Sequence, residues 1–423
     1  MGWDTSLCIQ RFENIATKTF DRHASSGFSF ARLQNLALSY LRDGQYSSSP
    51  IEAAFRSELG KDIRMFNPLS SDLKVAVTTT TAKESKTCLF SNYNGNLRSC
   101  DSGYDVVRTR ESVHDVSVAQ AASCTSAAPW FFRPKAIENV GTFQDGGLQH
   151  NNPLNLALWE LRHLWPDRST PDFALSIGTG YSESLLSRAC VGTQSPVRDR
   201  FIARLFKTFM KSLDGEKMWK EFHNSLPDYA KQRYHRINIA VEGSEPAIDD
   251  IASMHNLKRQ ALAFLERDNN LQAALDAMIS SLFYFELEDV PEQCETGYVC
   301  DGHIYCRLAL PPNGRRWLFT QLTKTSSFFI ILGQPIACVD RTSKNLPSFR
   351  RRVRFTIGSL DENIGITLRG ITDSPTAISG MPKTAKQLVE MQGLTADFGC
   401  LDHRGIDKAL PRLPQKRKHY GIA

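Results

Sequence analysis

Apolar residues along the first 180 positions of the chain follow helical and strand periods in turn. Apolar residues three or four positions apart are typical of amphipathic helices, and runs of β-branched and apolar residues are typical of strands. Because the two patterns alternate, this part of the sequence predicts an α/β fold. Helices are expected over residues 4–20, 51–60, 116–128 and 154–164. Strands are expected over residues 73–80, 87–93 and 172–180, with a short extended piece around 137–143.

The pattern changes in the rest of the chain. Residues 198–288 show helical periods only, and strand-like patterns return from Tyr298. The helical periods lie at residues 201–213, 254–266 and 271–283. The sequence therefore predicts four parts, of which the first is the α/β domain. They cover residues 1–185 (α/β domain), 186–290 (helical extension), 291–400 (β-rich basic accessory region) and 401–423 (basic tail).

Charge is distributed unevenly between these parts. The chain has 51 Lys and Arg against 45 Asp and Glu, a formal net charge of +6. Residues 291–423 hold 19 basic and 11 acidic residues, so they carry +8 and the preceding residues carry −2. One predicted strand there alternates Arg350, Arg352 and Arg354 with apolar residues. These arginines are candidates for binding phospholipid head groups or another anionic surface, although a solvated strand face is the simpler interpretation.

The composition excludes some classes of protein. With 41% hydrophobic residues and 24 Phe, the chain can bury ordinary cores, which rules out wholesale disorder. No apolar run approaches the roughly 20 residues of a bilayer span, and the first residues show no secretory signal. We therefore expect a cytoplasmic protein, with a peripheral position at membranes as a further possibility. The sequence shows no nucleic-acid-binding module, so a nucleic-acid partner is not expected.

The ten cysteines indicate neither disulfides nor a metal site. Without a secretory signal, the thiols are expected to be reduced. Only Cys294, Cys300 and Cys306 are clustered, and their x5 spacing is wider than the C-x2-C pairs typical of zinc sites. We interpret them as packed core cysteines and expect no metal.

Asp145 is the most informative single position. It stands at the end of a predicted strand, is followed by Gly146 and Gly147, and precedes a helix that begins near Pro153. Catalytic groups are often placed on such loops, because a rigid strand aims them and glycines allow the chain to turn tightly. For an isolated Asp-Gly-Gly, an aspartate that merely caps a turn is the simpler interpretation.

The surrounding motifs change that interpretation. Three of them occur in order, at residues 124–132 (CTSAAPWFF), 145–153 (DGGLQHNNP) and 175–180 (LSIGTG). Together they resemble the patatin-like phospholipase family, fungal members especially. The resemblance implies a three-layer α/β/α domain that hydrolyses acyl esters of lipids with a Ser–Asp dyad and no cofactor. It implies that Asp145 is the proton acceptor, and that the substrate is a phospholipid or acylglycerol at a membrane surface.

The chain departs from this family in one respect. A G-x-S-x-G elbow should carry the nucleophilic serine, and an earlier glycine-rich loop should form the oxyanion hole, but the sequence contains neither motif. We therefore expect an N-terminally truncated domain that starts just after the nucleophile and has no Ser–Asp hydrolysis on its own. Ser123 and Ser126 are weak substitutes, because small residues before Pro129 more often serve helix packing. His150 is more simply an ordinary loop histidine than a general base.

Two hypotheses follow. In the first, the chain is part of a lipid acyl hydrolase and supplies the aspartate but not the serine. In the second, it is a catalytically inactive scaffold that binds lipid or another protein. The sequence specifies no oligomeric state.

Overall fold

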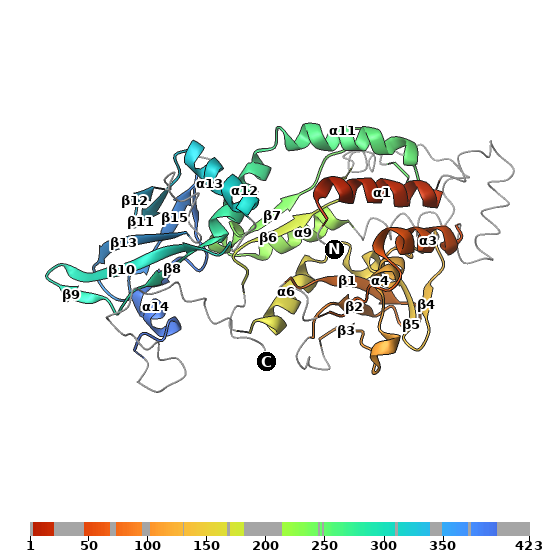
Figure 1. Ribbon diagram of the computed structural model, residues 1–423, viewed down its shortest axis with the longest axis horizontal. Helices are drawn as coiled ribbons and strands as arrows, with labels where there is room; N and C mark the ends of the chain where they lie inside the picture. The colour runs from red at the N-terminus through yellow and green to blue at the C-terminus, as the bar shows by residue number, and fades with distance from the viewer. Residues whose placement is uncertain are drawn as a thin grey trace. The chain divides into compact units, whose positions relative to one another are not determined.

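The computed structural model divides into two compact units, Met1–Asp268 and Asn269–Ala423 (Figure 1). Each unit has a hydrophobic core of its own among the described residues. The structure describes residues 3–20, 46–67, 73–94, 102–129, 131–166, 170–181, 214–243, 246–247, 249–308, 312–338, 349–370 and 374–395.

A five-stranded sheet forms the centre of the first unit in the part that the structure describes. Its spatial order is β3-β2-β1-β5-β4, and every neighbouring pair is antiparallel except β2 and β3, which are parallel. In the register between β1 and β5, Thr79 lies opposite Asp145. The strands are β1 (Ala76–Thr81), β2 (Thr87–Ser91), β3 (Tyr104–Val106), β4 (Lys135–Ile137) and β5 (Gly141–Asp145).

Helices cover both faces of this sheet. On one face, α4 (Val118–Thr125) buries Ala121 and Cys124 against apolar side chains of β2 and β5. On the other face, Leu156 of α6 (Leu154–Leu164) packs against Leu89 and Tyr104. The arrangement is a three-layer α/β/α domain, as predicted. The short helices η2 (Ser112–His114) and α5 (Gly147–His150) lie in the connections.

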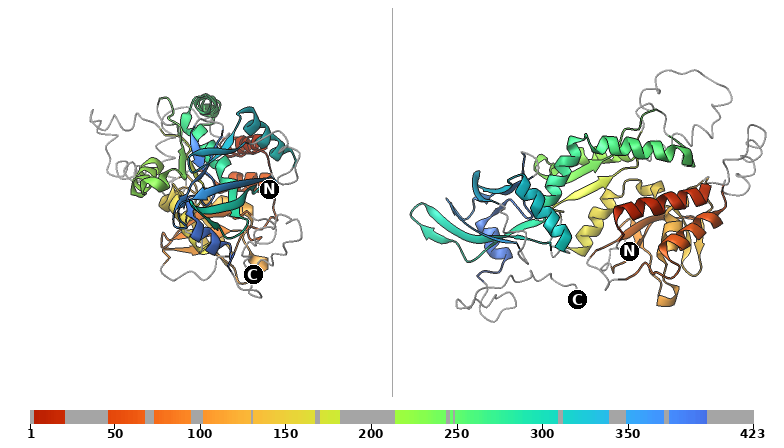
Figure 2. Two further views of the ribbon diagram at one scale, coloured as in Figure 1. Left: turned by 90° about the vertical axis from the view of Figure 1, so that its left-hand side faces the viewer. Right: turned by 45° about the horizontal axis from the view of Figure 1, so that its top comes forward.

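Two further helices, α1 (Thr5–Phe20) and α3 (Ser48–Leu59), pack together through ion pairs with one carboxylate. Arg11 and Lys18 of α1 both contact Glu58 of α3, at 3.3 and 3.0 Å. Helix α11 (Met254–Leu265) runs beside α1 in Figures 1 and 2, and its Lys258 pairs with Glu13 at 2.9 Å.

A second, two-stranded sheet completes the first unit. Strand β6 (Ala174–Ile177) pairs in parallel with β7 (Tyr234–Ile237), and Ser176 lies opposite Arg236. Helix α9 (Gly215–Ser225) precedes β7 and is capped by Asp214, whose carboxylate accepts a hydrogen bond from the Glu216 amide. The short elements α10 (Asp228–Lys231) and η4 (Ile251–Ser253) lie on either side of β7 in the sequence.

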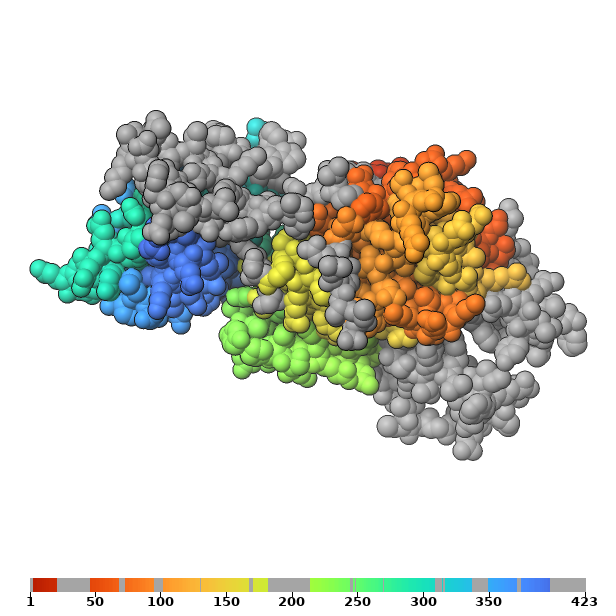
Figure 3. All heavy atoms as spheres, turned by 90° about the horizontal axis from the view of Figure 1, so that it is seen from below, coloured from red at the N-terminus to blue at the C-terminus, as the bar shows by residue number. Residues whose placement is uncertain are grey.

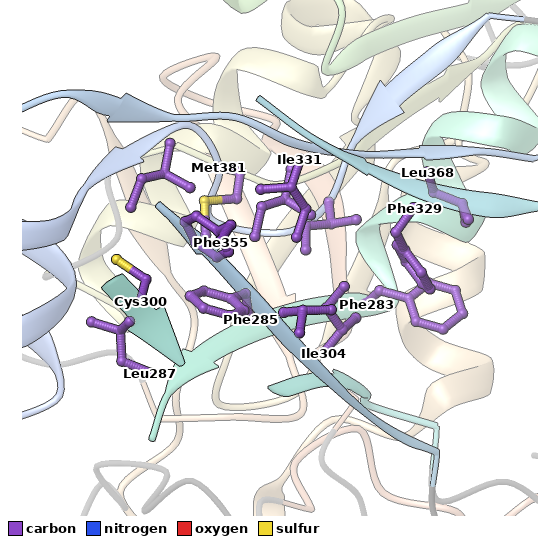
Figure 4. Packing of buried hydrophobic residues seen from close by; sticks show 14 of the residues in the cluster. Phe283, Phe285, Leu287, Cys300, Ile304, Phe329, Ile331, Phe355, Leu368 and Met381 are labelled. Carbon is purple, nitrogen blue, oxygen red and sulfur yellow. The ribbon is translucent and has the colours of Figure 1, made fainter. Parts of the chain in front are cut away.

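The second unit is rich in strands. In the largest cluster of buried residues, side chains of three helices pack against two antiparallel sheets (Figure 4). The ring of Phe283 lies edge to face against the rings of Phe329 and Phe349. The sheets have the orders β13-β10-β8, with β9 beside β10, and β12-β11-β15-β16. A two-stranded pair joins β14 and β17. The strands are β8 (Phe283–Leu287), β9 (Glu292–Cys294), β10 (Gly297–Cys306), β11 (Phe328–Ile331), β12 (Gln334–Cys338), β13 (Arg350–Ile357), β14 (Asn363–Ile364), β15 (Ile366–Arg369), β16 (Pro375–Ala377) and β17 (Lys383–Thr384). The helices are α12 (Asn269–Ser281), α13 (Pro312–Lys324) and α14 (Ala385–Met391).

Most elements predicted before residue 180 are present. The piece expected around 137–143 is two strands, because the chain turns between β4 and β5 with Asn139 at a φ of 60°. The prediction of helices alone over residues 198–288 was wrong, since β7 and β8 lie there. Strand β7 pairs with β6, and β8 pairs with β10. The helix expected over 201–213 and the tail 401–423 lie outside the described residues.

Candidate functional site

Asp145 is the last residue of β5, and neighbouring backbone fixes its position. Its amide donates to the carbonyl of Ala127 at 3.0 Å, just beyond α4. The next residue, Gly146, passes very close to β1, so that a β-carbon there would lie 2.3 Å from the Thr78 carbonyl oxygen. No side chain fits in that space. The glycine of the Asp-Gly-Gly motif therefore lets the chain leave the strand directly after the carboxylate.

The Asp145 carboxylate is suited to accepting a proton. Its Oδ1 accepts a hydrogen bond from the Gly147 amide at 2.7 Å, whereas Oδ2 accepts none from the residues that the structure describes. Burial raises the pKa of Asp145 above its ordinary value, and the Gly147 amide opposes this rise. A carboxylate with a raised pKa and an unoccupied oxygen can take a proton from a nearby hydroxyl.

The alternative residues considered in the sequence have structural roles. The hydroxyls of Ser123 and Ser126 each donate, at 2.8 Å, to a carbonyl four residues earlier in their own helix. Burial raises the pKa of Cys124 to about 12, so this thiol stays neutral and unreactive. The His150 ring lies edge to face against Trp159 at 6.3 Å, and burial lowers the pKa of His150. Among the described residues, no serine hydroxyl is hydrogen-bonded to Asp145.

A polar network that the sequence did not predict lies next to this motif. Asn152, seven residues after Asp145, hydrogen-bonds to Ser176 of β6, and Ser176 in turn to Arg236 of β7. Arg236 also pairs with Glu216 of α9. In Figure 3 the segment of α6 (yellow) lies against that of α9 (yellow-green). The sequence signal for Arg236 was weak, because it lies in a strand of only four residues.

The predicted arginine strip lies on β13 as expected, alternating with buried Val353 and Phe355. Arg352 and Arg354 are both paired with Asp301 of β10, at 3.4 and 3.6 Å. Arg352 also lies 3.8 Å from Glu288. These carboxylates cancel part of the positive charge of Arg352 and Arg354.

Comparison with known proteins bears on the first unit. Residues 1–158, which include Asp145 and the turn after it, match the family model of patatin-like phospholipases. This part of the chain is therefore similar to the patatin-like phospholipases. The match includes the five-stranded sheet, α4 and the whole Asp145 turn, and it ends within α6, before β6 and β7.

Individual phospholipases are similar over the same region. The calcium-independent phospholipase A2-gamma of rat is 30% identical over 164 residues, 38% of this chain and 20% of the rat protein. The human protein of that name is 46% identical over 164 residues, 38% of this chain and 19% of its own length. The mouse 85/88 kDa calcium-independent phospholipase A2 is 25% identical over 207 residues, 42% of this chain and 25% of its own length. The matched region thus spans about a fifth to a quarter of the length of these three relatives.

No helix that the structure describes is long and apolar enough to cross a bilayer.

Proposed function

We propose that this chain supplies the general base of a patatin-like lipid acyl hydrolase, and that Asp145 is that base. The observation that carries the proposal is the Asp145 carboxylate, which lies within the region that matches the family. Burial raises its pKa, and its Oδ2 accepts no hydrogen bond from the part of the chain that the structure describes. The substrate class is the phospholipids or acylglycerols, whose acyl ester bonds this chemistry cleaves.

The reaction proceeds in two steps. Asp145 removes the proton of a serine hydroxyl while the serine oxygen attacks the acyl carbonyl carbon, and preorganised N–H donors stabilise the oxyanion. The ester C–O bond then breaks, and the leaving alcohol takes the proton from Asp145. In the second step water attacks the acyl-serine while Asp145 accepts a proton from that water. The bond between the acyl carbon and the serine oxygen then breaks, Asp145 returns the proton to the serine oxygen, and the fatty acid is released.

This chain is proposed to be inactive alone, because it provides the base but no nucleophile. The sequence has no G-x-S-x-G motif, and the serines nearest in sequence to Asp145 hydrogen-bond to their own helix. The test is turnover of a p-nitrophenyl ester and of phospholipid vesicles by the purified chain. We expect the background rate for both the native chain and Asp145→Ala. A turnover that Asp145→Ala abolishes would show that the chain supplies its own nucleophile.

A second function, binding of anionic lipid by the second unit, is favoured by the arginines of β13. The side chains of Arg352 and Arg354 are both 65% exposed. Since Asp301 pairs with both, we propose that this surface binds head groups weakly and mainly through long-range charge attraction. Such binding would place the chain at a membrane surface whether or not it hydrolyses lipid.

A further inference from the structure

Three segments that lie far apart in the sequence meet behind the Asp145 turn. Asn152 is only 5% exposed, and both ends of its amide are hydrogen-bonded. Its Oδ1 accepts from the Ser176 hydroxyl at 3.1 Å and from the Leu154 amide at 3.3 Å, and its Nδ2 donates to the Gly215 carbonyl at 3.4 Å. Asn152 is thus attached to its own helix start, to β6 and to the start of α9.

Arg236 holds the partners of Asn152 together. Its Nη1 donates to the Ser176 hydroxyl at 2.8 Å and its Nε donates to Glu216 Oε1 at 2.8 Å. The same Glu216 oxygen accepts from Asn238 at 2.6 Å. The Arg236 side chain is only 10% exposed, so its charge depends on Glu216 for compensation. The planar guanidinium supplies two donors in fixed directions, which a lysine cannot.

The Ser176 hydroxyl links Arg236 to Asn152, because it is hydrogen-bonded to both side chains. It has a single proton, which it donates to Asn152, while its oxygen accepts from Arg236. Without Arg236, the hydroxyl could rotate away and Glu216 would be left as an uncompensated, partly buried charge. The position of Asn152 therefore depends on Arg236 through one hydroxyl group.

Two glycines, Gly178 and Gly215, provide the space that the Arg236 guanidinium occupies. A β-carbon at Gly178 would lie 2.8 Å from Arg236 Nη2 and 2.2 Å from Asn238 Oδ1, and one at Gly215 would lie 3.3 Å from Arg236 Nη2. Gly178 belongs to the 175–180 motif singled out in the sequence. The network explains why a glycine stands at this position.

The turn that carries Asp145 is held at both ends. At its start, Asp145 is paired with Thr79 of the five-stranded sheet. At its end, Asn152 is held by Ser176 and Gly215. Between them, the amides of Gln149 and His150 both donate to the Gly146 carbonyl, which makes the turn compact. A displacement of Asn152 therefore shifts the environment of the carboxylate.

We propose that Arg236 is a positioning residue that, through Ser176 and Asn152, fixes the turn in which Asp145 acts. This proposal deepens the assignment of Asp145 as a base and rests on it. It also assigns a role in the site to residues 214–238, which lie beyond the region that matches the family.

The test measures the pKa of Asp145 directly in the full chain, by ¹³C NMR titration of labelled aspartate carboxyl groups. Asp145→Asn identifies the signal by its loss. In Arg236→Ala we expect the Asp145 pKa to fall by about half a pH unit, because a loosened turn hydrates the carboxylate. Removal of a nearby positive charge alone would raise this pKa, so the sign separates positioning from direct charge attraction. Arg236→Lys, which keeps the charge but not the two fixed donors, should give a fall of the same sign.

Two further variants make the test decisive. Ser176→Ala removes only the bridging hydroxyl and should also lower the Asp145 pKa. It therefore tests the positioning role even if Arg236→Ala does not fold. Arg108→Ala is the matched control, because Arg108 is another arginine of this unit whose donors go to Ser91 and Tyr93 instead. The proposal is overturned if the pKa is unchanged or raised in Arg236→Ala and in Ser176→Ala, or falls equally in Arg108→Ala. The proposed function fails separately, if the purified chain hydrolyses ester well above the background rate and Asp145→Ala abolishes that turnover.

Discussion

Gly146 lies so close to Thr78 that a β-carbon at position 146 would be 2.3 Å from the Thr78 carbonyl oxygen and 2.4 Å from its hydroxyl oxygen. The contact is with a backbone atom of the central strand β1, which cannot move without disturbing the sheet. The glycine after Asp145 is therefore required by the close approach of two chain segments.

Gly146→Ala should destabilise the first unit by about 1–3 kcal/mol, since overpacking forces backbone shifts of this cost. The measurement is urea unfolding followed by tryptophan fluorescence, which reports mainly on the first unit because Trp317 is the one tryptophan of six beyond residue 268. Gly103→Asn is the control in the same unit, because no atom lies within 4 Å of its added β-carbon and asparagine tolerates the φ of 73° at this position. Equal midpoints for Gly146→Ala and the native chain would refute the packing argument.

Glu160 should anchor α6 to the sheet. Both of its carboxylate oxygens accept tyrosine hydroxyls, from Tyr93 at 2.5 Å and from Tyr104 at 2.6 Å, and Glu160 is buried. Tyr93→Phe or Tyr104→Phe should each cost about 1–3 kcal/mol, because a buried acceptor loses a donor. The same unfolding measurement applies, with Tyr229→Phe as the control because Tyr229 is 77% exposed. A loss no larger than that of the control would show that the two hydroxyls contribute nothing.

The raised pKa of Asp145 also affects stability. Burial raises the pKa of this carboxyl in the folded chain, so the folded state binds more protons than the unfolded state as pH rises past the ordinary aspartate value. Its ionisation therefore lowers stability with increasing pH. Asp145→Asn keeps an oxygen that can accept from the Gly147 amide, and it should be more stable than the native chain at neutral pH. The difference should disappear below about pH 3.9, where the native carboxyl is protonated in both states. A variant that is less stable at neutral pH would contradict this.

The arginines of β13 should give salt-dependent binding to anionic vesicles. The triple variant Arg350→Ala, Arg352→Ala, Arg354→Ala should sediment less with vesicles that contain phosphatidylserine, and the difference should shrink as salt rises. Asp301→Asn should act in the opposite direction, because it removes the carboxylate that pairs with Arg352 and Arg354. Binding that none of these substitutions changes would exclude this face as the lipid-binding surface.

Elements that depend on neighbouring residues were predicted from the sequence, whereas elements that depend on pairing with distant residues were missed. Helix α6 was predicted over residues 154–164 and is found there, because apolar spacing and the Asn-Asn-Pro start are local signals. Strand β7 was missed, because it has four residues, includes His235 and Arg236, and pairs with a strand some 60 positions earlier.

For the site, Asp145 and the glycines after it were predicted from motifs that lie together in the sequence. The network of Arg236, Ser176 and Asn152 could not be predicted, since only folding brings these three residues together.

We propose that the chain supplies Asp145 as a base but no nucleophile. Ester turnover by the purified full chain, measured side by side for the native sequence and Asp145→Ala, tests this proposal. Both should remain at the background rate. A native turnover well above background that Asp145→Ala reduces by about 100-fold or more would contradict it, because a group within this chain would then be the nucleophile.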